Sequence, residues 1–192
     1  MIFEKTISRE IEASPGAILW NYWDHEHLYV VHKNYSVAYV LYEDHKMAVY
    51  TLKYHLPVLR FITSNSMNVM IQHDPKTVKA YNMGILGVPV STTITVEELR
   101  KDHCRLTMHY KFALSGWKQV LKFFLPKMVE KWNLQVWLED LPIKLRRHKV
   151  MRCGFKDFVG LPKELKDRDF QGEVPFELPI KRHKDSPVNL SL

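Results

Sequence analysis

Two histidines and an aspartate stand close together near the start of the chain, in the order Asp24-x-x-His27-x-x-x-x-His32. If His27 and His32 lie on or beside one short helix, both imidazoles can turn toward the same point. Two imidazoles and one carboxylate on one face of a metal form the facial triad of mononuclear non-haem Fe(II) sites, which leaves positions open for O₂ and substrate. The spacing therefore suggests such a site, with a carboxylate still to come from elsewhere in the chain.

A carboxylate of the required kind lies on a long helical pattern near the other end of the chain. At helical spacing, one stripe has a single polar member: Leu125, Val129, Trp132, Val136, Asp140 and Ile143. A carboxylate on an inward-facing apolar stripe costs free energy unless something compensates it, and a metal would do so. Asp140 is therefore the preferred third ligand. Glu139, which shares a stripe with Met128 and Gln135, is the second choice.

Simpler roles would also account for these residues. The chain has ten histidines, so a short histidine motif can arise by chance. His25 and His32 could be polar residues at the rim of a helix, and an aspartate shortly before a proline often ends a helical turn. The pocket would then be metal-free and would hold an apolar ligand.

The elements that position these residues follow from the spacing of the apolar side chains. Residues 3–11 alternate as a half-buried strand does, and Ser14 and Pro15 can cap and open a helix over 15–23. A short helix over 25–32 follows. Six further strands are predicted, at 35–42, 47–55, 58–72, 77–85, 88–99 and 104–114. From 115 to 151 the period is helical, with a kink or break expected at Pro126 and at Pro142.

This order of elements predicts an α+β fold, in which a curved antiparallel sheet of about seven strands surrounds a long C-terminal helix. Residues 1–155 should form the domain with an internal pocket, and 156–192 an irregular extension. The side chains expected to line the pocket are Tyr22, Met108, Tyr110, Trp132 and Val136. The order resembles that of the helix-grip (SRPBCC) superfamily of START-like lipid carriers, polyketide cyclases and plant pollen allergens, which implies an apolar cavity between sheet and helix.

Two segments resemble a particular family within this superfamily. Asn21-x-x-Asp24-x-x-His27-x-x-x-x-His32 is similar to the iron-binding motif in the catalytic domain of Rieske-type ring-hydroxylating oxygenases. Leu138-Glu139-Asp140-Leu141-Pro142-Ile143 resembles the segment that carries that family's third ligand, notably in its steroid-acting branch. The resemblance implies an Fe(II) ion held by His27, His32 and Asp140.

Asp24 resembles the aspartate that bridges the iron site and the cluster of a neighbouring subunit in that family. In this chain we expect it just outside the metal ligands, where its carboxylate could accept a hydrogen bond from the distal nitrogen of His27 and fix the tautomer. The resemblance also favours a homo-oligomer, a trimer in that family.

The chain departs from the family in having no Rieske domain. Its two cysteines, Cys104 and Cys153, belong to no C-x-x-C or C-x-H pair, which excludes a disulfide framework, a structural zinc knuckle and a self-contained iron–sulfur cluster. A separate reductase or Rieske protein would have to deliver electrons. Otherwise the reaction needs none, or the site binds a ligand without turnover.

Composition adds further expectations. Met1-Ile2-Phe3 runs straight into Glu4-Lys5, without a charged-then-apolar leader, and no apolar run approaches the roughly 18 residues of a membrane span. We therefore expect a cytoplasmic protein without a transmembrane segment. The net charge is +7, and no nucleic-acid motif accompanies the basic residues Lys144, Arg146, Arg147, Lys149, Arg152 and Lys156.

Three functions fit these patterns. The first is an Fe(II)-dependent, oxygenase-like enzyme, an oxidoreductase acting on an apolar cyclic or aromatic molecule. The second is a metal-free START-like binding protein or a polyketide cyclase. The third is an accessory subunit whose basic segment, 144–156, docks on an acidic reductase or a membrane surface, or is simply a solvated helix end.

Overall fold

A computed structural model of the protein describes residues 1–25, 27–55 and 63–153. The described strands form one antiparallel sheet in the order β1-β7-β6-β5-β4-β3-β2. Its strands are β1 (Ile2–Ile11), β2 (Tyr35–Glu43), β3 (Met47–His55), β4 (Thr63–Asp74), β5 (Thr77–Met83), β6 (Pro89–Arg100) and β7 (His103–Ala113). The helices are α1 (Pro15–Trp23), α2 (His27–Val31), α3 (Leu125–Arg152) and two 3₁₀ turns, η1 (Ile85–Gly87) and η2 (Gly116–Phe123).

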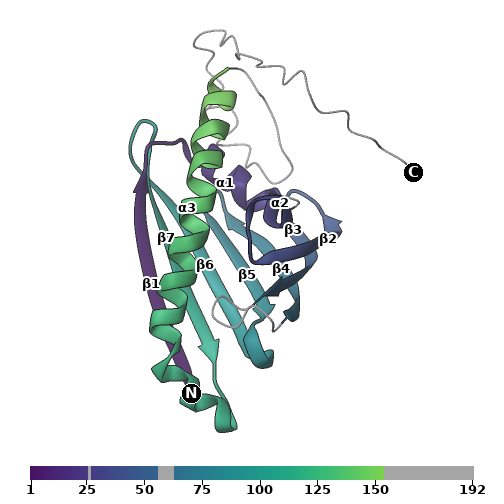
Figure 1. Cartoon of the computed structure of the whole chain (residues 1–192). Helices are drawn as coiled ribbons and strands as arrows, with labels where there is room; N and C mark the ends of the chain where they lie inside the picture. Colours follow the sequence, from purple (N-terminus) through teal and green to yellow (C-terminus); the bar gives the residue numbers. More distant parts are fainter. Residues whose placement is uncertain (26, 56–62, 154–192) are drawn as a thin grey trace, which may run out of the picture.

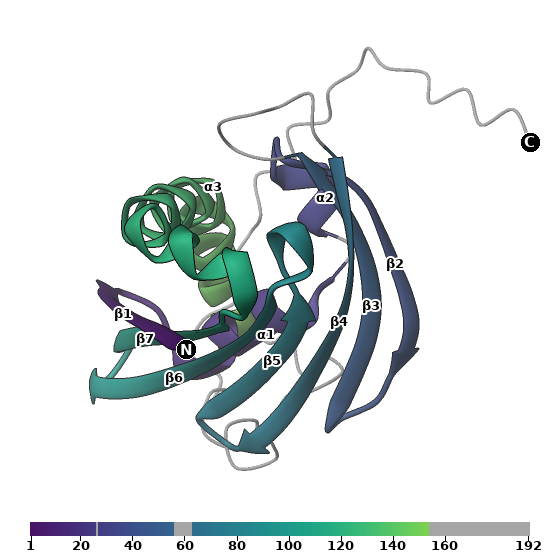
Figure 2. The same cartoon turned by 90° about the horizontal axis from the view of Figure 1, so that it is seen from below.

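The sheet curves around the long helix α3, which lies across its concave face (Figures 1 and 2). Successive strands from β2 to β7 pair with their sequence neighbours, and β1 pairs with β7 along its whole length, from Ile2 opposite Ala113 to Ile11 opposite Cys104. This is the helix-grip α+β architecture predicted from the order of the elements.

Alternation of side chains gives the sheet its inner face. In β3 the residues Ala48, Tyr50, Leu52 and Tyr54 are all buried, whereas the intervening residues are less so. Successive strand side chains point to opposite faces, so these four point toward α3. The core of the domain is therefore the space between sheet and helix, closed at one end by α1 and α2.

The two short helices start as their residues predict. The Ser14 side chain accepts a hydrogen bond from the Ala17 backbone N–H, and Pro15 occupies the first turn of α1. Ile18 and Leu19, both on α1, are fully buried. The second helix is shorter than the expected 25–32 and covers five residues, with His27 at its start.

The C-terminal helical segment confirms the break expected near Pro126, and it differs from the prediction in its 3₁₀ start and at Pro142. Residues 116–123 form a 3₁₀ helix, and α3 begins only at Leu125, with Pro126 in its first turn. The break expected at Pro142 is absent, because α3 continues through it to Arg152. Pro142 has no backbone N–H, so the carbonyl of Leu138 loses its hydrogen-bond donor. Both residues lie on the exposed face of the helix, where water can bond to that carbonyl.

Two expectations fall on parts of the chain outside the described residues. The proposed extension 156–192 lies there, and so does the first part of the strand predicted at 58–72, whose described part begins at Thr63. Within the described residues, no helix is both long and apolar enough to cross a membrane.

Candidate metal centre

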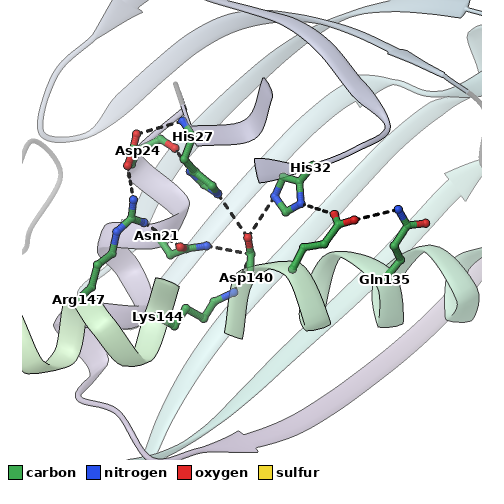
Figure 3. Close-up of polar contacts among 9 residues, drawn as sticks. Asn21, Asp24, His27, His32, Gln135, Asp140, Lys144 and Arg147 are labelled. Carbon is green, nitrogen blue, oxygen red and sulfur yellow. Dashed lines mark hydrogen bonds and ion pairs between the residues drawn. The ribbon is translucent and has the colours of Figure 1, made fainter. Parts of the chain in front are cut away.

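Two elements, α2 and α3, bring His27, His32 and Asp140 together. His27 opens α2, His32 follows the last residue of α2, and Asp140 lies on the face of α3 turned toward them (Figure 3). One ligand atom from each side chain lies within 4.8 Å of the others. Asp140 Oδ1 is 3.4 Å from His27 Nε2 and 3.1 Å from His32 Nε2. All three residues are buried.

The three atoms that face one another form no hydrogen bond with any other described residue. In the described part of the chain, His27 Nε2, His32 Nε2 and Asp140 Oδ1 are all buried without a hydrogen bond of good geometry. Buried polar atoms are normally satisfied, so three such atoms at one point indicate a missing partner. Ligands at right angles and about 2.1 Å from a metal lie roughly 3.0 Å apart, which is close to the 3.1 Å between Asp140 Oδ1 and His32 Nε2 and somewhat below the 3.4 Å between Asp140 Oδ1 and His27 Nε2. The residues therefore fit a metal ion.

The remaining polar atoms of the histidines are held in place. His32 Nδ1 donates a hydrogen bond to Glu139 Oε2 at 2.8 Å, and Gln135 Nε2 donates to the other Glu139 oxygen at 3.1 Å. His27 Nδ1 donates to the backbone carbonyl of Asp24. A proton on each Nδ1 leaves Nε2 as the lone-pair atom, which is the form that binds a metal.

Asp24 has a different contact from the one expected. Its carboxylate does not accept from the His27 ring. It accepts the His27 backbone N–H at 3.3 Å and forms an ion pair with Arg147. The backbone turn at the C-terminal end of α1 places the Asp24 carbonyl against the ring, so the carboxylate is left to anchor α3.

Asp140 is fixed through its second oxygen. Asn21 Nδ2 and Lys144 Nζ donate to Oδ2 at 2.8 and 2.7 Å, which leaves Oδ1 facing the histidines. Burial alone would raise the pKa of the Asp140 carboxyl. The approach of His27 and His32 and the charge of Lys144 outweigh burial, so its pKa lies well below the ordinary value.

Lys144 and His32 also have shifted pKa values. Burial lowers the pKa of Lys144, and the Asp140 carboxylate offsets only part of that effect. Burial also lowers the pKa of His32, but its contacts with Asp140 and Glu139 outweigh burial and raise it overall. The site is thus a compact group of opposite charges with little access to water.

The basic segment is not the single solvated surface that we considered. Lys144 is 1% exposed and Arg147 is 8% exposed. Arg147 donates to Asn21 Oδ1 at 2.7 Å and lies over the Trp20 ring. Arg152 bonds to Asp102 at 3.1 Å, and Lys156 lies outside the described residues. Positions four and seven after Asp140 share its helix face, which could have indicated that Lys144 and Arg147 point inward.

The triad forms part of the wall of a cavity of about 330 Å³ between the sheet and α3. This volume lies within the range of small-molecule sites. All five side chains expected to line the pocket do so: Tyr22, Met108, Tyr110, Trp132 and Val136. Most of the other lining residues are apolar or aromatic. The Tyr22 hydroxyl is buried and has no hydrogen-bond partner among the described residues, so it is free to bond a polar group of a ligand.

Comparison with known proteins supports the fold. Neither a protein-family model nor a curated protein sequence matches the chain. Among solved structures, the Zhui aromatase/cyclase from Streptomyces sp. R1128 superposes with a TM-score of 0.60 at 10% identity, covering 78% of this chain and 94% of that one. Human STARD10 gives a TM-score of 0.56 at 11% identity, with 77% and 67% covered.

The chain also superposes on about half of a solved structure that has two domains. The di-domain ARO/CYC StfQ from the steffimycin biosynthetic pathway gives a TM-score of 0.66 at 4% identity, with 77% of this chain and 52% of that chain covered. These superpositions establish the helix-grip fold. At such low sequence identities they do not establish function, which has to be argued from the site itself.

Proposed function

We propose that this protein binds one Fe(II) ion on His27, His32 and Asp140 and is an oxygenase-like oxidoreductase acting on an apolar cyclic or aromatic molecule. The observation that supports the proposal is the convergence of three buried atoms without a hydrogen-bond partner among the described residues, on side chains whose other polar atoms are held by hydrogen bonds. Two imidazoles and one carboxylate leave several positions of a six-coordinate ion open. Iron bound in this way supplies the redox chemistry needed to activate O₂.

The residues around the triad have separate roles in this proposal. Glu139 and the Asp24 carbonyl orient the two imidazoles. Asn21 and Lys144 occupy Asp140 Oδ2, so that the carboxylate offers a single oxygen. The apolar wall, which includes Met108, excludes water from the reacting atoms. Electrons would come from a separate protein, because the chain lacks cysteines for its own cluster.

Metal analysis after anaerobic reconstitution with Fe(II) tests the proposal. We expect about one iron per chain in the unaltered protein and almost none in His27→Ala or Asp140→Ala. His109→Ala is the matched control, because His109 lies on β7 with a partly exposed side chain paired with Glu4. It should retain iron. If the unaltered protein holds no iron, or if His109→Ala loses as much as His27→Ala, the proposal is wrong.

A second candidate function is supported by the fold comparison. Aromatase/cyclases and STARD10 share the architecture, and the cavity here, of about 330 Å³, is mainly apolar. A metal-free binding protein or a polyketide cyclase would use the cavity alone. In that case His27→Ala should leave the affinity for an apolar ligand nearly unchanged, and lipid or polyketide should co-purify with the protein.

A further inference from the structure

The end of the molecule opposite α2 exposes a group of large apolar side chains. They lie on η2, directly after it, at the end of β5 and on η1. We call them the η2 patch: Met83, Leu86, Trp117, Val120, Phe123 and Phe124. Each is between 47% and 70% exposed. Lys118 Nζ donates to the Gly87 carbonyl at 3.1 Å, which ties the two segments together. In Figure 1 this end lies at the bottom, near the N-terminus.

Exposure of this kind is unusual when it is concentrated. Single exposed apolar residues are common, but neighbouring aromatic residues on one short element mark an interaction site. The cavity is lined by Leu121, on the inner side of η2, and by Leu125, at the start of α3. The inward face of η2 is therefore packed against the cavity. The η2 patch is therefore a second apolar face that points away from the core.

The charges around the η2 patch have one predominant sign. Between Ser115 and Lys131 the chain has four lysines and one glutamate, and that glutamate, Glu130, pairs with Lys5. Lys122 Nζ lies 4.9 Å from the centre of the Phe123 ring, so its stem runs beside the apolar surface and its charge lies at the edge. Aromatic side chains surrounded by lysines are typical of segments that lie in the interface of an anionic bilayer.

The cavity reaches the surface at the same place. Phe124 lines the cavity and is also 65% exposed, so it lies at an opening. Leu125, the first residue of α3, and Asp140, fifteen residues further along the helix, both line this cavity. At 1.5 Å per residue the cavity extends roughly 22 Å along the helix. An apolar molecule that enters beside Phe124 could reach the triad along a wall that is mainly apolar.

We propose that the η2 patch docks this protein on the surface of an anionic lipid bilayer, with the cavity opening against the membrane. Trp117 and Phe123 enter the interfacial region, and Lys122 and Lys127 contact the lipid phosphates and carboxylates. An apolar ligand then passes between bilayer and cavity without crossing water. This inference goes beyond the proposed metal centre and does not depend on it, because protein stripped of metal should dock equally well.

Co-sedimentation of the full chain with lipid vesicles tests the proposal. We expect binding to phosphatidylcholine vesicles that contain phosphatidylserine, much weaker binding to phosphatidylcholine alone, and release at high salt. Trp117→Ser with Phe123→Ser should weaken the partition at least about tenfold. Lys122→Glu with Lys127→Glu should weaken it roughly 30-fold, given the contribution of each lysine near an anionic surface.

Matched controls separate the patch from general stickiness and charge. Tyr39→Ser removes a 66% exposed aromatic residue on β2, and Lys101→Glu with Arg146→Glu reverses two exposed charges near the opposite end of α3. Both controls should bind as the unaltered protein does. Circular dichroism and thermal melting confirm that every variant is folded. In a second measurement, brominated phosphatidylcholine in the vesicles should quench the fluorescence of Trp117, and Trp117→Phe should lose that quenching.

Three results would overturn the proposal. The unaltered protein could fail to bind either kind of vesicle, or could bind both equally with no effect of salt. The patch variants could bind vesicles as tightly as the controls. Finally, the protein could ignore vesicles but self-associate in sedimentation velocity, with dimers lost only in Trp117→Ser with Phe123→Ser, which would make the patch a protein interface.

Discussion

Asp140 has a separate role for each carboxylate oxygen. Oδ2 accepts hydrogen bonds from Asn21 and Lys144, and Oδ1 faces two imidazole nitrogens. A carboxylate that only compensated Lys144 would not need to lie 3.1 Å from His32 Nε2. At the scale of single residues, the proposed metal would explain why His27 and His32 are buried beside Asp140.

Replacing Lys144 removes the cation that forms an ion pair with the Asp140 carboxylate. We expect Lys144→Met to lower the free energy of unfolding of metal-free protein by about 3 kcal/mol, because one member of a buried ion pair remains alone. Added Fe(II) should reduce this loss by compensating Asp140. Urea unfolding with and without metal measures both, with exposed Arg146→Met as the control. An equal loss in both conditions would argue against a cation at this point.

Glu139 should control how well the site holds its ion. Glu139→Ala removes the acceptor for His32 Nδ1–H, so the ring can rotate and change tautomer. We expect the metal affinity to fall by about 10–100-fold, as measured by competition with a chelator. Glu130→Ala, on the exposed side of the same helix, should leave it unchanged. A Glu139→Ala protein with full affinity would show that this contact is unrelated to metal binding.

At the scale of elements, the sequence was most informative where one periodicity applied throughout. The bounds of α1 and β3 agree with their predictions, because a cap or strict alternation defines them. The 3₁₀ form of η2 was not predicted, since its apolar residues fit either helical period. The spacing of Asp24, His27 and His32 and the polar position in the α3 stripe predicted which residues the structure brings together. The roles of Asn21 and Lys144 depend on contacts between α1 and α3, which spacing alone does not reveal.

The turn between β2 and β3 has its own dependence on pH. Asp44 accepts hydrogen bonds from the Tyr42 hydroxyl and from the backbone N–H groups of Lys46 and Met47, all at 2.7 Å. These bonds lower the pKa of Asp44 to about 2, with the Tyr42 bond contributing most. A carboxyl whose pKa is lower in the folded state stabilises that state above its ordinary pKa. The contribution is lost as the pH falls from about 4 to 2.

We therefore expect Asp44→Ala to melt at a lower temperature than the unaltered protein at pH 6, because three hydrogen bonds are lost. The difference between the two melting temperatures should shrink as the pH approaches 2. Thermal melting followed by circular dichroism over this range measures it. A difference that stays constant with pH would mean that the charge of Asp44 does not stabilise the turn.

At the scale of the whole molecule, the fold places two features at opposite ends of one cavity. The triad residues lie at α2 and on α3, and the η2 patch lies where α3 begins. Figure 1 shows α2 and the start of α3 near opposite ends of the sheet. The helix-grip architecture explains this, because a long helix lying in a curved sheet encloses an elongated space. The net charge of +7 suits a protein that works near an anionic surface.

Filling the cavity should separate ligand binding from metal binding. Val136 lines the cavity one helical turn before Asp140, so Val136→Trp should occupy the space of a ligand without touching the triad. We expect the affinity for an apolar fluorescent probe to fall at least about tenfold, and iron content to stay unchanged. Leu134→Trp, on the exposed face of α3, is the control. Unchanged probe binding in Val136→Trp would place the ligand elsewhere.

The most direct test of the central claim is an anomalous difference map at the iron absorption edge, from crystals of protein reconstituted anaerobically with Fe(II). We expect a single strong peak within about 2.3 Å of His27 Nε2, His32 Nε2 and Asp140 Oδ1. A map without a peak between these three atoms, from protein shown to be folded, would contradict the metal centre. So would a peak held by other residues.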